Sequence, residues 1–436
     1  MLRCRTDGRD VMEMLDDGLR DVAVEIGRKI GVAEMLDDGQ RDRMEALNRE
    51  QLDMVEASAG EQGGKMSMSV DGQMDGIEAL NGGQGDQVEM RNNRLWASVE
   101  SVSGAALVYT TRGDLVENVH RGHVAVVRAD GELAAEAGDA NVWTYMRSAA
   151  KPIQAMVALM SGAVDALGLD DEALALMCAS HQGGTAHIKV LERMLAQTGV
   201  MEDELSFHRT LPSGLVERET FLRSGGERRK LYHVCAGKHI AMLAVSKHQG
   251  WSPASYTEPD HPLQQKVLHS LSLFAGLPPE ELRLAVDGCG LPVAALPLWR
   301  LALAYARLSV QPEAWADAAL RAAAARIAAA MNRHPALVEG SGRLATAMLG
   351  DSNVVAKSGA QGIFVFALRQ EQLAVAIKLD DGGESAWPQA ACAVLEQLRV
   401  GGDLADRIRS QFPPTIVNDV GETVGSRVPC LRLRLL

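Results

Sequence analysis

The alternation of apolar and polar residues predicts strands at both ends of the region that follows residue 100. Residues 105–111 and 122–128 are rich in Val, Ala and Thr and flank a polar turn, as strands of a hairpin do. Residues 362–368 and 373–379 are apolar and are joined by another polar turn. A shorter strand is expected at 141–145. The predicted strands thus lie near the two ends of this region.

Ala-rich segments between these strands predict helices, because their apolar residues recur at helical spacing. The last helix is placed by Pro388, which is tolerated in a first turn. The expected helices are 152–168, 187–198, 238–246, 313–331 and 385–400. Strands at both ends with helices between them predict an α+β fold, with a mixed or antiparallel sheet flanked by helices and a helical subdomain.

The first 92 residues differ in composition from the rest. They contain no aromatic residue, and their 11 Lys and Arg against 21 Asp and Glu give a net charge of −10, out of −13 for the whole chain. A nine-residue pattern beginning at Glu13 recurs at Glu34, and this period of 21 also suits a short amphipathic helix or coiled coil. Little large apolar surface is available to bury, so we expect a loosely ordered acidic extension over 1–92 and a globular domain over 93–436.

Charge and cysteine usage exclude several classes of protein. No basic stripe is present, which argues against a nucleic-acid partner. No apolar run reaches the ~18 residues that a membrane span requires. The N-terminus has no apolar signal segment, and the six cysteines lack the spacing of a disulfide scaffold. We therefore expect a cytoplasmic protein with reduced thiols.

Lysine is scarce, with ten Lys against 34 Arg, and three of the ten fall in short chemical patterns. These are Ser148-x-x-Lys151, Cys235-Ala-Gly-Lys238 and Lys357-Ser-Gly. Arginine stays charged in proteins, whereas a buried lysine can lose its proton and activate a serine. The placement of these lysines suggests an amidohydrolase that uses Ser-Lys chemistry.

Ser148 and Lys151 open a predicted helix, where residues three apart share a face. The helix N-terminus also disfavours a protonated amine there. Ser-x-x-Lys on an early helix and Lys-Ser-Gly on a late strand follow the order found in serine β-lactamases and penicillin-binding proteins, although the Ser-Asp-Asn element is missing. The alternative is an N-cap serine beside a solvated lysine, with Lys357 starting a strand.

Cys235 and Cys289 each lie near glycine, and two thiolates with a third ligand and water would suit zinc. His239 is the third ligand by ordinary preference, and two small buried thiols are the alternative. Ser180 and His181 are neighbours, but adjacent side chains rarely face each other, so a turn serine ahead of the next helix is the simpler interpretation.

Five segments together resemble the rhizobial-type L-asparaginase family, also called class 3 or asparaginase II-like. The resemblance covers roughly residues 103–390 and rests on 147–154, 178–181, 235–239, 287–292 and 357–360, in this order. It implies a catalytic domain over 93–436 with a fold similar to serine β-lactamases and glutaminases, and hydrolysis of L-asparagine to L-aspartate and ammonia.

The resemblance also implies roles for individual residues. Two Ser-Lys tandems would be Ser148 with Lys151 and Ser180 with Lys357. Zinc would be bound by Cys235, Cys289 and Lys238, with Lys238 taking the place expected for His239, and would serve substrate binding more than bond breaking. The predicted substrate-binding residues are Arg147, His181, His239 and Asp287. A homodimer is expected.

The mechanism that follows is nucleophilic. A neutral Lys151 takes the proton of the Ser148 hydroxyl, which attacks the side-chain amide, and water then hydrolyses the acyl-enzyme. The chain departs from the family at Gly184 and Gln361, where glutamate is usual, and at Ala236, where serine is usual. The lost carboxylates bear on substrate preference and activity. Two alternatives remain, a penicillin-type serine hydrolase and a non-catalytic zinc-containing binding protein of the same fold.

The extension is expected to be dispensable for catalysis, because it precedes every motif on which the function rests. A chain starting near Asn92 should fold and keep its activity per active site. Ammonia release and molar mass should both be measured, since loss of the 21-residue repeat could change the oligomeric state. An insoluble or inactive truncation at matched concentration would show that the extension packs on the catalytic domain.

Overall fold

A computed structural model describes residues 104–313 and 315–436. The predicted extension over 1–92, its repeat and the boundary at 93 lie outside these residues. None of the helices in the described ranges has the length and apolar character that a membrane crossing requires.

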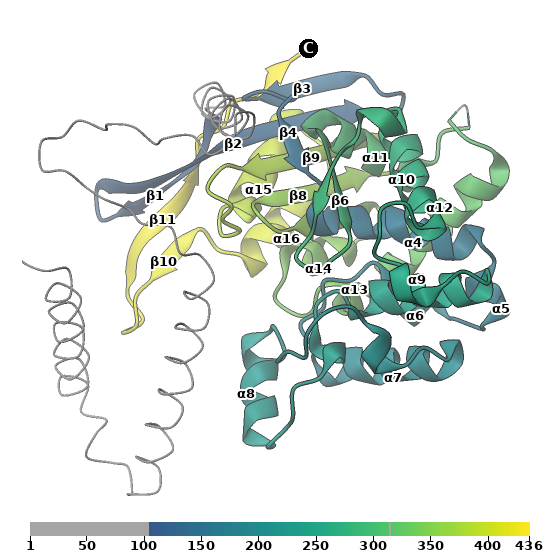
Figure 1. Cartoon of the computed structure of the whole chain (residues 1–436). Helices are drawn as coiled ribbons and strands as arrows, with labels where there is room; N and C mark the ends of the chain where they lie inside the picture. The colour runs from purple at the N-terminus through teal and green to yellow at the C-terminus, as the bar shows by residue number, and fades with distance from the viewer. Residues whose placement is uncertain (1–103, 314) are drawn as a thin grey trace, which may run out of the picture. The chain divides into compact units, whose positions relative to one another are not determined.

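The described residues form a large sheet in which every strand pair is antiparallel. Its main path runs in the order β10-β11-β1-β2-β9-β8-β7, and β3 pairs with β2 and β12 beside this path (Figure 1). The strands are β1 Ala105–Arg112, β2 Leu115–Arg128, β3 Leu133–Ala137, β7 Val354–Gly359, β8 Ile363–Leu368, β9 Leu373–Leu379, β10 Thr415–Val417, β11 Thr423–Pro429 and β12 Arg434–Leu435. The antiparallel alternative of the predicted α+β fold is therefore confirmed.

The long strand β2 joins the two ends of the chain. Its first half pairs with β1, and its second half pairs with β9 in a register that runs from Gly122 opposite Leu379 to Arg128 opposite Leu373. A Cβ at Gly122 would lie 2.0 Å from the Lys378 carbonyl oxygen, so the crossing point requires glycine. The hairpins predicted separately at the two ends thus become neighbours in one sheet.

A second, three-stranded sheet has the order β4-β6-β5. Its strands are β4 Trp143–Tyr145, β5 Arg283–Val286 and β6 Pro292–Pro297. β4 confirms the short strand expected at 141–145, and it leads directly into the turn that carries Ser148.

Helices occupy the middle of the chain and follow β9, as predicted. They are α4 Lys151–Met160, α5 Ala163–Ala166, α6 Asp171–Met177, α7 Thr185–Thr198, α8 Leu215–Arg223, α9 Ala236–His248, α10 Pro262–Ala275, α11 Leu298–Val310, α12 Ala318–Arg333, α13 Pro335–Val338, α14 Leu344–Leu349, α15 Trp387–Leu398 and α16 Leu404–Gln411. The single helix expected at 152–168 is divided, because Gly162 takes a left-handed φ of 77° between α4 and α5. The helices that were not predicted are α6, α8, α10, α11, α13, α14 and α16.

Both faces of the sheet are covered around β8, whose residues are all buried. Successive side chains of a strand point to opposite faces, so a fully buried strand needs packing on each side. α11 packs against β2, β8 and β9. Trp387 of α15 lies with its ring 5.4 Å from that of Phe364 and donates its indole N–H to the Gly362 carbonyl oxygen.

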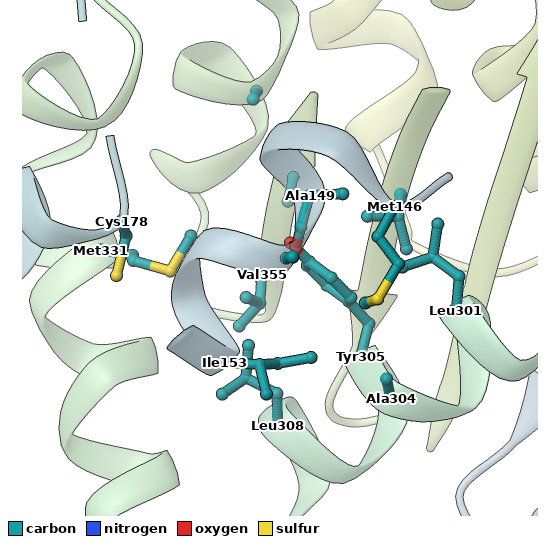
Figure 2. Packing of buried hydrophobic residues seen from close by; sticks show 14 of the residues in the cluster. Met146, Ala149, Ile153, Cys178, Leu301, Ala304, Tyr305, Leu308, Met331 and Val355 are labelled. Atoms are coloured by element: carbon teal, nitrogen blue, oxygen red, sulfur yellow. Dashed lines mark hydrogen bonds between the residues drawn. The ribbon is translucent and has the colours of Figure 1, made fainter. Parts of the chain in front are cut away.

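The packed core reaches directly to the turn that carries Ser148. The short 3-10 helix η2, Arg147–Ala150, precedes α4, and Ala149 contributes to the buried cluster. Figure 2 shows Tyr305 of α11 pointing at Ala149. The fully buried Tyr305 donates its phenolic O–H to the Ala149 carbonyl oxygen over 2.8 Å. This bond satisfies a backbone group that helix geometry leaves free and ties the turn to the core.

Candidate active site

Ser180 lies just after α6 and is half-buried. Its backbone N–H donates to the Val338 carbonyl oxygen over 2.8 Å, which fixes the turn against the last residue of α13. Two lysine side chains converge on its hydroxyl. Nζ of Lys151 lies 3.0 Å from Ser180 Oγ, and Nζ of Lys357 lies 3.1 Å from the same oxygen.

Lys357 enters this site from β7 and is fully buried. Its ammonium forms an ion pair with Glu339 and donates to the Ser358 carbonyl oxygen over 3.0 Å. Glu339 also accepts from the Ser358 N–H at 2.9 Å and the Ser358 hydroxyl at 2.6 Å. Burial alone would raise the pKa of Glu339, but the charge of Lys357 and these hydrogen bonds hold it below its ordinary value. The buried cation therefore faces a buried carboxylate.

Lys151, which is 1% exposed, is the first residue of α4. Its other partners are two backbone carbonyl oxygens, that of Ala179 at 2.5 Å and that of Val234 at 3.2 Å. Burial lowers the pKa of Lys151 to about 8, and the positive charges of Lys238 and Lys357 act in the same direction. The neighbouring thiols of Cys235 and Cys289 oppose that shift. No carboxylate contributes to the shift, so the amine can be neutral near physiological pH.

The predicted pairing of Lys151 with Ser148 is not seen as a hydrogen bond and stays a prediction. Among the hydrogen bonds of the described residues, the Lys151 amine is paired with Ser180 and not with Ser148. The first residue of a helix directs its side chain according to packing against neighbouring elements, and here α4 packs on α6 and α9. The predicted proximity of Ser180 to Lys357 is found.

Ser148 nevertheless lines the same cavity as Ser180. The cavity has a volume of about 270 Å³ and is lined by Ser148, Ser180, Gln182, Ser213, Val234, Arg343, Ser358, Ala360 and Glu384. Gly359 brings the Ser148 turn close to β7, because a Cβ there would lie 3.0 Å from the Met146 carbonyl oxygen. Ser148 and Ser180 therefore line one small cavity, together with two further serines.

Arg147 and Asp287, both predicted to bind substrate, bind each other. Arg147 Nε donates to Asp287 Oδ1 over 2.9 Å, and neither residue lines the cavity. Arg147 has a left-handed φ of 48°, which costs a non-glycine residue about 1–2 kcal/mol. The ion pair thus holds a strained residue directly before Ser148.

His181 and His239 are fully buried, and neither lines the cavity. Neither ring nitrogen of His181 has a partner among the described residues, and burial lowers its pKa well below the ordinary range. Nδ1 of His239 lies 2.8 Å from the Tyr256 hydroxyl, while burial and then Lys238 lower its pKa well below the ordinary range. Both imidazoles are therefore neutral, and their binding of substrate stays a prediction.

The three predicted zinc ligands lie together beneath the site. Nζ of Lys238 is 3.3 Å from Sγ of Cys289, and the two cysteines are free thiols joined by a hydrogen bond. That bond, with Lys151 and Lys238 nearby, lowers the pKa of Cys235 well below its ordinary value and raises that of Cys289. Gly237 lets α9 approach α6, because a Cβ there would lie 2.2 Å from the Leu176 carbonyl oxygen.

This cluster fits zinc in the type of its donors. Thiolate sulfur and amine nitrogen are both zinc ligands by chemistry, and both cysteines are buried. Within the described ranges no group of three His, Cys, Asp or Glu side chains is placed for a metal, so the Lys238 amine is needed as third donor. Burial lowers the pKa of Lys238, but the sulfurs of Cys235 and Cys289 raise it, and the net effect is a raised pKa. Metal binding would therefore release a proton from this amine.

Sequence reasoning missed the charged residues around the cavity, Glu339, Arg343 and Glu384. A usable signal was the spacing Glu339-Gly-Ser-Gly-Arg343, in which two glycines bracket a turn between two opposite charges. Gly340 has a left-handed φ of 97°, and a Cβ there would lie 2.2 Å from Gln182 Oε1. This close approach places Gln182 in the cavity wall.

A glutamate side chain lies near Gly184, one of the two positions where the family usually has glutamate. A Cβ at Gly184 would come within 3.6 Å of Oε1 of Glu217, a residue of α8. A carboxylate thus stands beside Gly184 although the sequence has none at that position. Gln361 takes a left-handed φ of 65° and its amide oxygen lies against Gly382.

Comparison with known proteins gives one extensive sequence match. A family model described as L-asparaginase II matches residues 108–429, which is well over half of the chain. No curated protein sequence matches the chain.

Solved structures similar to the chain include those of a protein named Mglu. One of them is 18% identical with a TM-score of 0.38, over 64% of this chain and 61% of that structure. The chain thus spans less than two thirds of the Mglu chain. Another, described as the L-glutamate-binding form of Mglu, is 17% identical with a TM-score of 0.37 over the same shares. A β-lactamase from Mycobacterium bovis is 15% identical with a TM-score of 0.34, over 64% of this chain and 95% of that one. At these TM-scores the matches identify no function.

Proposed function

Because the chain belongs to the L-asparaginase II family, whose members are amidohydrolases, we propose that it hydrolyses the side-chain amide of L-asparagine with Ser180 as nucleophile. The observation that carries the proposal is the convergence of two buried lysines on the Ser180 hydroxyl. A serine hydroxyl is a weak nucleophile unless a neighbouring base takes its proton.

The hydrogen bonds around Ser180 support a definite distribution of protons. A neutral amine has two N–H bonds and one lone pair, and Lys151 has two carbonyl oxygens as acceptors. Its lone pair is then left for the Ser180 O–H. A charged lysine has three N–H bonds, and Lys357 has three acceptors in Glu339, the Ser358 carbonyl and Ser180. Ser180 thus donates to Lys151 and accepts from Lys357.

The reaction follows from this arrangement. Lys151 takes the Ser180 proton as the oxygen attacks the amide carbon, and it gives that proton to the departing ammonia. Water then attacks the acyl-enzyme, with Lys151 again as base, and releases L-aspartate. The positive charge of Lys357 beside Ser180 favours the negative charge that develops on the substrate oxygen. Ser148, on the wall of the same cavity, is placed to donate a hydrogen bond to the substrate.

Serine substitutions test which hydroxyl is the nucleophile. Ser180→Ala and Lys151→Ala should each lower kcat by roughly 10⁴-fold or more, because the covalent step is lost. Ser148→Ala should cost only about 10- to 100-fold, the loss of a positioning hydrogen bond. The rate of ammonia release measures kcat for the three variants, and circular dichroism checks that each is folded.

A diazoketone analogue of asparagine provides an independent readout, because it alkylates the nucleophile and the labelled peptide can be sequenced by mass spectrometry. Label on Ser180 is expected. Label on Ser148, or near-parental turnover of Ser180→Ala, would restore Ser148 as the nucleophile. Hydrolysis of a chromogenic β-lactam without ammonia release from asparagine would favour a penicillin-type hydrolase, and neither activity would favour a binding protein.

The rate should depend on the protonation of Lys151. Burial lowers its pKa to about 8, and the charges of Lys238 and Lys357 act in the same direction. Only the neutral amine is a base, so kcat/KM should rise with pH, about tenfold per unit below pH 8, and level off above it. A profile from pH 6 to 9.5 measures this, with the exposed Lys189→Gln as control. A flat profile, or one that falls with rising pH, would contradict the assignment.

We also propose that Cys235, Cys289 and Lys238 bind zinc. A bound zinc supplies positive charge that holds both sulfurs as thiolates and links the α9 and β5–β6 segments below the cavity. The residues of the chain that break the amide bond are the same with or without it. The predicted homodimer and cytoplasmic location stay predictions.

Metal analysis of protein purified without chelator should find about one zinc per chain. Cys289→Ser should lose the metal and lower Tm, whereas Cys430→Ser, outside the cluster, should change neither. A metal-free protein that is stable and fully active would refute the zinc site. A Cys235–Cys289 disulfide would do the same.

A further inference from the structure

The cavity next to Ser180 has two charged side chains in its wall, and their signs are opposite. Arg343 and Glu384 both line it, and Nη2 of Arg343 donates to Oε2 of Glu384 over 2.6 Å. Their side chains are 34% and 44% exposed, so water and solutes reach them. The remaining wall consists of hydroxyls, one amide and two apolar residues.

The other charged side chains near the cavity form ion pairs that do not line it. Lys357 and Glu339 are buried against each other. The Arg147–Asp287 pair lies outside the cavity wall. Arg343 and Glu384 are thus the charged groups that a solute in this cavity meets.

We propose that Arg343 binds the α-carboxylate and Glu384 the α-ammonium group of a free amino-acid substrate, which restricts the enzyme to zwitterionic amides. This inference rests on the proposed function. A guanidinium fits a carboxylate with two parallel N–H bonds, and a carboxylate accepts readily from an ammonium group. The neutral amide of the substrate then falls to the uncharged part of the cavity, where Ser180 lies.

The exchange of partners balances in charge. The Arg343–Glu384 pair opens, and each side chain gains one oppositely charged group of the substrate, so no charge is left unpaired. An exposed ion pair of this kind is worth little by itself, which makes its opening inexpensive. Arg343 and Glu384 also line a second cavity of about 450 Å³, whose wall includes Trp387 and Phe412. This cavity gives the two charged side chains room to separate.

The position of Arg343 in the chain orients its guanidinium group. It precedes α14 and follows Gly342, which takes a left-handed φ of 73°. Nε of Arg343 lies 3.9 Å from Oε2 of Glu339, the partner of Lys357. Arg343 and Lys357 thus both contact Glu339, which fixes the charged end of the substrate relative to Ser180.

Four amides separate the two charges of the substrate. L-asparagine carries both, succinamate lacks the α-ammonium group, 3-aminopropanamide lacks the α-carboxylate, and propanamide lacks both. The parental enzyme should lose roughly tenfold or more in kcat/KM for each charge removed. This measurement needs no variant, so it decides the inference even where a substitution prevents folding.

Variants assign each charge to a side chain. Arg343→Gln should raise KM for L-asparagine and succinamate by roughly 10- to 100-fold and leave 3-aminopropanamide nearly unchanged. Glu384→Gln should raise KM for L-asparagine and 3-aminopropanamide and leave succinamate nearly unchanged. Arg326→Gln breaks an Arg–Asp pair of the same type on the surface and serves as control.

Each other outcome has a definite meaning. If the variants Arg343→Gln and Glu384→Gln raise KM equally for all four amides, the two side chains have a structural role and the inference is overturned. No change in KM would overturn it as well. If Arg147→Gln, and not Arg343→Gln, raises KM only for the amides that carry a carboxylate, the subsite lies at the Arg147–Asp287 pair. If the parental enzyme releases ammonia from none of the amides, the proposed function fails as well, whereas activity without charge dependence refutes only the subsite.

Discussion

The burial of two lysine amines against one serine hydroxyl is the constraint on which the site depends. Removing a cation from water is costly, and proteins meet this cost with a paired charge or by loss of the proton. Lys357 has a paired charge, because Glu339 is buried beside it. Lys151 faces only carbonyl and hydroxyl oxygens, and burial lowers its pKa to about 8. The same fold therefore brings two buried lysine amines with different surroundings to 3.0 and 3.1 Å from one oxygen.

The scaffold has to bring this set together from elements that are distant in sequence. Ser180 follows α6, Lys151 begins α4, and Lys357 lies on β7, a strand of the antiparallel sheet that packs beside the Ser148 turn. Helix α11 supports that turn through the Tyr305 hydrogen bond and packs on three strands of the sheet. Close contacts at glycine, such as Gly359 against the Met146 carbonyl, let these elements approach to the distances that the chemistry requires.

Local features of the chain were predictable, and spatial pairings were not. The strands at 105–111 and 373–379 were found because their alternation is a property of a few adjacent residues. Helix α11 carried a usable signal that was not used, since Arg300 and Arg307 are seven residues apart, a spacing that places them on one face of a helix. The pairing of Lys151 with Ser180 depends on how α4 packs on α6, and no spacing along the chain contains that information. Glu339 had no local mark beyond the glycines that follow it, because its burial is set by Lys357.

The thiol cluster and the serine turn are coupled through one ion pair. Asp287 lies two residues before Cys289 in the turn between β5 and β6, and its carboxylate holds Arg147, which has a left-handed backbone one residue before Ser148. Anything that orders the Cys289 turn therefore also orders the cavity wall at Ser148, and a strained backbone persists only where its surroundings determine it. Lys151 adds a second connection, since its amine donates to the carbonyl directly before Cys235. A ligand on the two thiols would thus act on the position of both serines and on the charge of the base, while it contacts neither serine.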